Sequence, residues 1–127
     1  IDLDQEGIKL ILSFIIPENG KKVVLYNIND RALNYAIVRK DNMVEFDYPV
    51  ESVYQHPDFK FDRTPDNRSV TFSNKNATYK IEDHPNKLGI EITVGGQTYY
   101  LSGNQKTKTG GLDRLLNVQL DNVVNQN

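Results

Sequence analysis

The two histidines have the most versatile side chains of this sequence, because an imidazole can bind a metal ion or transfer a proton near neutral pH. His56 and His84 lie far apart, and each precedes a proline. A metal site would need them close together, with carboxylates at suitable spacing. A Ser-His-Asp triad would need a serine on a sharp elbow, whereas Ser73 and Ser102 fall at expected turns. We therefore interpret both histidines as exposed turn residues and predict no metal site.

The acidic residues could supply a second chemistry, because glycosidases use two carboxylates roughly 5–9 Å apart. Glu45 and Asp47 alternate along one expected strand, and Glu91 lies on another. Acids at alternate positions are typical of the solvated face of a sheet. The chain has no cysteine, which excludes thiol catalysis, disulfides and cysteine-bound zinc. We therefore predict that the protein is not an enzyme and carries no cofactor.

A polar loop over residues 102–111 is the clearest candidate for binding. It carries Lys106 and Lys108, contains no acidic residue, and has glycines near both ends. Loops on a rigid scaffold often hold binding residues, and an acidic cleft on a partner protein would attract the two lysines. We therefore expect a flexible finger with Ser102, Lys106 and Lys108 as candidate partner-binding residues. A solvated connection without a partner would explain the same composition.

Tyr99 and Tyr100 are further candidates for partner binding. Adjacent residues of a strand point to opposite faces, so one of the two is expected to face outward. A tyrosine suits an interface because its ring packs while its hydroxyl stays hydrated. Strand packing explains most of the other tyrosines.

These candidates depend on a scaffold of hairpins. Gly95 and Gly96 separate two strands and suit a type I′ turn, in which both central residues need a positive φ. The same alternation between turn signals predicts strands over residues 8–16, 21–28, 33–39, 43–48, 68–73, 77–82, 89–94 and 97–101, with 118–120 as a last short strand. Residues 50–67 are predicted to be a loop that could hold an ion, and Leu112, Leu115 and Leu116 predict one helical turn near 112–116.

The predicted architecture is all-β. We expect a single domain over residues 1–127, with 1–7 and 122–127 loose. About eight strands in consecutive hairpins indicate an antiparallel barrel or sandwich.

Composition narrows the possible functions. The chain has 127 residues and a net charge of −2 with scattered lysines and arginines, which argues against nucleic-acid binding. No apolar run approaches the ~18 residues needed to span a bilayer. The sequence begins at Ile1 without methionine, which favours an exported protein whose leader has been removed, or a fragment of a longer protein. We therefore expect a periplasmic or secreted protein, whose full-length form could carry a lipid anchor.

Several turn-and-strand patterns together resemble a known group of proteins. They are Leu33-x-Tyr35, Met43 to Pro49, Val70-x-Phe72-x-Asn74, Tyr79-x-Ile81, Gly89-Ile90-x-Ile92 and Gly96-Gln97-x-Tyr99. Their order over residues 33–120 is similar to small exported bacterial proteins, often lipoprotein-like, of uncharacterised role. That group looks architecturally like the eight-stranded barrels that inhibit lysozymes with a serine and a lysine from neighbouring loops. The resemblance implies that Ser102 with Lys106 or Lys108 would enter an acidic cleft.

The leading hypothesis is a non-enzymatic binding protein, an inhibitor or immunity factor for a cell-wall hydrolase or toxin. One alternative is a carrier with a small ligand in the mouth of the barrel. Another is a structural domain of a larger envelope protein. The partner and the oligomeric state stay open, although edge strands could pair in a dimer if the barrel is open.

Overall fold

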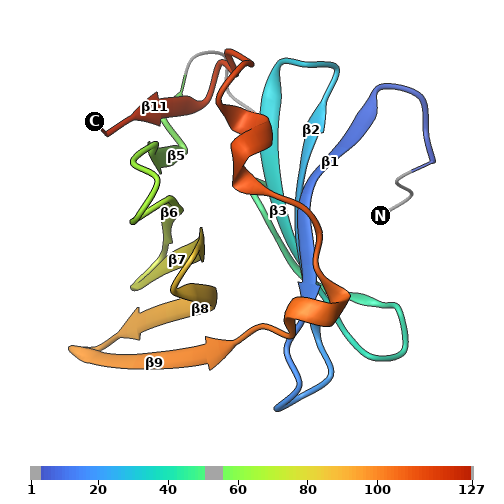
Figure 1. Ribbon diagram of the computed structural model, residues 1–127. Helices are drawn as coiled ribbons and strands as arrows, with labels where there is room; N and C mark the ends of the chain where they lie inside the picture. Colours follow the sequence, from blue (N-terminus) through green and yellow to red (C-terminus); the bar gives the residue numbers. More distant parts are fainter. Residues whose placement is uncertain (1–3, 51–55, 127) are drawn as a thin grey trace.

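The structure, a computed structural model, describes residues 4–50 and 56–126 and is built from strands with almost no helix (Figure 1). The all-β prediction is confirmed. One sheet has the order β10-β1-β2-β3-β4, with β1 Ile8–Ile15, β2 Lys22–Ile28, β3 Ala32–Val38, β4 Val44–Tyr48 and β10 Thr109–Gly110. The other has the order β11-β5-β6-β7-β8-β9, with β5 Phe59–Asp62, β6 Ser69–Asn74, β7 Ala77–His84, β8 Lys87–Val94, β9 Gln97–Ser102 and β11 Val123–Asn125.

Consecutive antiparallel hairpins form the body of each sheet. Strands β1 to β4 follow one another in the first sheet and β5 to β9 in the second. The chain then returns to the first sheet, where β10 pairs with β1. The last strand, β11, pairs with β5 in parallel, so the expectation of a wholly antiparallel fold was wrong for that pair. Within the described residues the two sheets do not close into one barrel.

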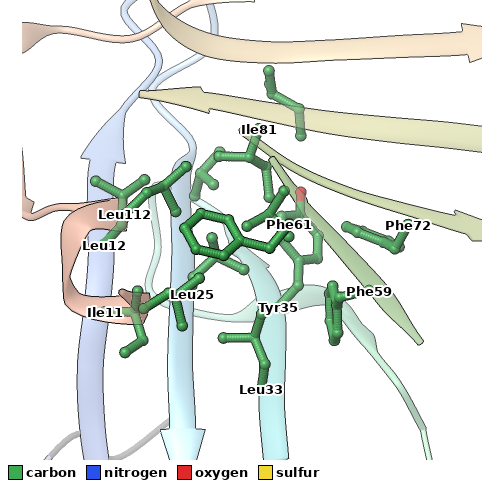
Figure 2. Close-up of a cluster of buried hydrophobic side chains, with 14 of the residues drawn as sticks. Ile11, Leu12, Leu25, Leu33, Tyr35, Phe59, Phe61, Phe72, Ile81 and Leu112 are labelled. Carbon is green, nitrogen blue, oxygen red and sulfur yellow. The ribbon is translucent and has the colours of Figure 1, made fainter. Parts of the chain in front are cut away.

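One hydrophobic core joins the two sheets. Alternate residues of each strand point inward, so Leu12, Leu25 and Tyr35 of the first sheet meet Phe59 and Ile81 of the second (Figure 2). Each of these side chains is at most 1% exposed, and burial of such side chains is worth ~1.5–3 kcal/mol apiece. Large side chains therefore occupy the space between the sheets.

The segment over residues 50–67 contains more structure than we expected. Phe59–Asp62 is strand β5, and its phenylalanines are buried in the core. The loop prediction was wrong there because Phe59 and Phe61 alternate with Lys60 and Asp62, a short period-2 pattern that the flanking prolines obscured. Residues 51–55 lie outside the described residues.

The two ends of the chain are also more ordered than predicted. Residues 122–127 were expected to be loose, but Val123–Asn125 pairs with β5 and Asn122 is only 2% exposed. No strand forms over 118–120. Gly7 accepts a hydrogen bond from the Asn29 backbone, while residues 1–3 and 127 lie outside the described residues.

The predicted helical turn near 112–116 is present as the 3₁₀ helix η2, Leu112–Leu115. No helix in the described part of the chain is long and apolar enough to cross a membrane.

Candidate functional site

The segment after β9 is fastened to β1. The backbone N–H of Asn104 donates to the Ile15 carbonyl at 2.8 Å, and the Thr107 hydroxyl accepts from the Ile15 N–H at 2.9 Å. Residues Gln105–Thr107 form the 3₁₀ helix η1, whose first turn the Asn104 side chain caps. The expectation of a flexible finger was wrong, because the segment satisfies its backbone groups against a strand edge.

The two lysines of this segment have different surroundings. Lys108 Nζ lies 2.7 Å from Asp83 Oδ1, and the other oxygen of Asp83 accepts the Leu112 N–H at 2.9 Å. The Asp83 side chain is only 10% exposed. Lys106 is exposed and makes no ion pair with any residue that the structure describes. Asp83 of β7 therefore holds both Lys108, which follows η1, and the first residue of η2, while Lys106 remains available to a partner.

Tyr100 lies flat on the outer face of the second sheet. Its hydroxyl donates to the Leu88 carbonyl at 3.1 Å, and Lys87 Nζ lies 4.3 Å from the centre of its ring. Gly89 makes room for the ring, because a Cβ there would meet the phenol. Burial raises the pKa of Tyr100 most, the charges of Glu82 and Glu91 raise it further, and a hydrogen bond with Ser102 lowers it.

Tyr99 points to the other face of the same strand. It stands opposite Ile92, which packs against the core, and its hydroxyl donates to Gln97 at 2.6 Å. Its side chain is nevertheless 54% exposed, and that of Tyr100 is 37% exposed. Adjacency placed the two tyrosines on opposite faces as predicted, and β9 offers aromatic surface on both.

His84 belongs to a buried polar cluster on the β7–β8 turn. Its Nε2 lies 3.0 Å from Glu82 Oε2, and both side chains are less than a tenth exposed. Lys87 Nζ lies 3.7 Å from the other oxygen of Glu82. The interpretation of His84 as an exposed turn residue was wrong, because residues 82 and 84 share one face of the strand and Lys87 returns across the turn. His84 Nδ1 has no hydrogen-bond partner among the described residues.

His56 forms a second, separate cluster. Its side chain is 57% exposed, which agrees with the exposed position expected for it, and its Nδ1 lies 2.6 Å from buried Asp58. The Asn122 amide donates to the other oxygen of Asp58 at 3.2 Å. Within the described residues, no group of three or more histidine, aspartate or glutamate side chains is arranged to hold a metal ion.

Two adjoining surface hollows lie between the β7–β8 turn and the 102–110 segment. One, of about 330 Å³, is lined by Lys87, Tyr100, Ser102 and Gln105 among others. The other, of about 510 Å³, is lined by residues that include Arg68, Asp83, His84, Gln105, Lys108 and Asp113. Pro85 and Gln105 contribute to both hollows. We call the two together the Tyr100 groove.

Three of the five predicted binding residues meet in this groove. Tyr100, Ser102 and Lys108 line it, whereas Tyr99 and Lys106 do not. Sequence reasoning missed Lys87 and Gln105. The sequence contained a signal for Lys87, because this residue follows the Pro85-Asn86 turn and comes two positions before Gly89. A glycine in a strand has no side chain, so an aromatic side chain of the neighbouring strand can cover that position.

The Tyr100 groove presents cations, an aromatic ring and amide and hydroxyl groups on hydrogen-bonded strands and on the segment fastened to β1. Lys87 and Arg68 lie along it, and its carboxylates Asp83 and Asp113 lie at the η2 end. These groups suit recognition of a polar, acidic surface rather than bond-breaking chemistry.

Comparisons of the chain with protein-family models, with curated proteins and with solved structures found no match.

Proposed function

We propose that this protein is a non-enzymatic binding protein that engages an acidic region of another protein through the Tyr100 groove. The observation that carries the proposal is the meeting of Tyr100, Ser102 and Lys87 in one hollow, with Lys108 in the next. Each is held by an element of the second sheet or by the segment fastened to β1, so little conformational entropy is lost on binding. Exposed Lys106 adds a positive charge beside the groove.

The partner class we favour is a cell-wall hydrolase or toxin, with this chain as inhibitor or immunity factor. The acidic clefts of such hydrolases suit a surface that carries Lys87, Lys106 and Arg68. This role implies export to the periplasm or the cell surface. It also fits an open two-sheet sandwich, in which the hairpins present loops at the sheet ends.

The structure offers less support for a small-ligand carrier. A carrier of this kind needs space between its sheets, and Phe14, Tyr35 and Phe61 fill that space with side chains at most 1% exposed. The hollows that form the Tyr100 groove are open and polar. We therefore favour a protein partner over an enclosed apolar ligand.

The test measures binding and inhibition against a panel of purified lysozymes and related cell-wall hydrolases. Gln105→Glu adds a negative charge within both hollows, and we expect it to weaken binding about 5- to 10-fold, mainly through a slower association rate. Gln119→Glu makes the same chemical change at an exposed position outside the groove and should leave binding unchanged. Absence of binding across the panel at low salt, or equal effects of the two variants, would count against the proposal.

A further inference from the structure

We propose that two copies of this chain pair through the free edges of their β9 strands, antiparallel and centred on Tyr99, so that the two second sheets become continuous. This inference concerns self-association and does not rest on the proposed partner. Strand β9 is the last strand of its sheet (Figure 1).

The backbone of β9 has hydrogen-bonding groups to offer. A two-residue turn joins β8 to β9, so Gln97, Tyr99 and Leu101 direct their N–H and C=O groups toward β8. Gly103 keeps this alternation, because its N–H donates to the Leu88 carbonyl at 2.8 Å. The N–H and C=O groups of Thr98, Tyr100 and Ser102 therefore point away from β8, where no strand of the described residues pairs with them.

The other three sheet edges are less suited to self-pairing. Strand β10 has two residues and β11 has three. Strand β4 has five residues, but Glu45 and Asp47 would face the same acids of a second copy. Proteins commonly protect edges with such charges, with proline or with bulges. Strand β9 has six residues and none of these devices.

Both faces of β9 would gain contacts from a second copy. Centring the pair on Tyr99 sets this residue opposite its own counterpart on the core-side face, where it is 54% exposed. Thr98 of one copy then stands opposite Tyr100 of the other, on the outer face. Because β9 carries no charge, the antiparallel pairing brings no like charges together.

The position of β1 limits the register. Beyond Ser102 the outward-facing N–H of Asn104 already donates to Ile15. A second copy can therefore pair only with residues before that point, and a centre at Tyr99 ends the pairing at Ser102. The two-fold axis lies perpendicular to the sheet, so both Tyr100 grooves face the same side and the dimer is bivalent toward a target.

The first experiment measures molar mass by sedimentation equilibrium from low micromolar to submillimolar protein. We expect a monomer–dimer equilibrium. Thr98→Pro removes one outward N–H and leaves every backbone bond to β8 in place, and it should weaken the dimer at least tenfold. It also removes the contact between the Thr98 and Thr93 hydroxyls at 3.1 Å, which the control below removes equally. Thr98→Val keeps the N–H and should dimerise like the unaltered chain. Far-ultraviolet circular dichroism and thermal unfolding verify that each variant is folded.

The second experiment uses the absence of cysteine from the chain. A single Tyr99→Cys substitution should yield a disulfide-linked dimer under mild oxidation, because residues facing each other across a two-fold axis are within bridging distance. Asp47→Cys on the β4 edge is the matched control and should not cross-link efficiently. A monomer at every concentration overturns the proposal. A dimer that tolerates Thr98→Pro, or that cross-links through position 47 but not 99, also overturns it.

Discussion

The ring of Tyr100 lies directly over Gly89 on the neighbouring strand. A Cβ built on Gly89 would stand 2.7 Å from Tyr100 Cζ and 2.5 Å from the Leu101 carbonyl oxygen. The absence of a side chain at position 89 thus lets the phenol reach the Leu88 carbonyl and lets Lys87 cover the ring. One glycine therefore shapes the floor of the Tyr100 groove.

Gly89→Ala should destabilise the fold and disturb the groove together. The added methyl group must displace both the Tyr100 ring and backbone, and such overpacking typically costs about 1–3 kcal/mol. Urea unfolding measures the loss. Tyr100→Ala removes one of the two obstacles, so the same substitution should cost less in that background. An equal cost in both backgrounds would show that the ring does not rest on Gly89.

The buried tyrosine of β3 should make stability fall at alkaline pH. Burial raises the pKa of Tyr35 above its ordinary value of 10.0, and the charges of Tyr79 and Glu45 raise it further. The folded state then holds a proton that the unfolded state releases, so this stabilisation is complete below pH ~10 and declines as pH rises toward the folded pKa. Tyr35→Phe should make the decline of the unfolding free energy above pH ~10 shallower. Parallel declines in the two proteins would contradict this expectation.

The two lysines around η1 should respond differently to removal of their charge. Lys108→Met leaves Asp83, which is 10% exposed, without its cation, while Lys108 itself is 28% exposed. We expect a loss of about 1–2 kcal/mol, less than for a fully buried pair because of this partial exposure. Lys106→Met is the control and should change stability by less than ~0.5 kcal/mol. Thermal unfolding measures the stability of both variants. Equal losses of stability would show that the contact between Lys108 and Asp83 is unimportant.

Among the polar residues, Asn122 should be one of those whose replacement lowers the free energy of unfolding most. Its side chain acts like a short piece of strand at the edge of β3, because its Oδ1 accepts the Leu33 N–H at 2.8 Å and its Nδ2 donates to the Leu33 carbonyl at 2.9 Å. Asn122→Ala should cost about 2–3 kcal/mol, since buried backbone groups lose their partners. Exposed Asn125→Ala should cost far less in the same denaturant titration.

Local patterns made most of the strands predictable from the sequence. Alternation and turn residues located β1 to β4 and β6 to β9 to within two residues at each end, and the Gly95-Gly96 turn was located correctly. These features depend on neighbours in the chain, which a sequence displays directly. The placement of Tyr99 and Tyr100 on opposite faces followed from the same alternation.

Long-range contacts account for what the sequence did not reveal. Asn122 is buried because its amide pairs with Leu33, 89 positions away in the chain. Lys108 is held by Asp83 of β7, so this binding residue could be named from the sequence but its partner could not. Such contacts depend on how the two sheets meet, and a single sequence has no local pattern for that.

The Gly95-Gly96 turn permits a last test that separates backbone strain from packing. Both glycines have positive φ, +57° and +79°, and a Cβ at either position would meet nothing within 4 Å. Gly95→Ala should therefore cost about 1–2 kcal/mol through the left-handed backbone alone. Gly95→Asn should cost clearly less, although asparagine is larger, because its side chain tolerates this conformation. Unfolding free energies from urea titration decide the matter, and an equal or greater loss with asparagine would show that side-chain size, not φ, governs the turn.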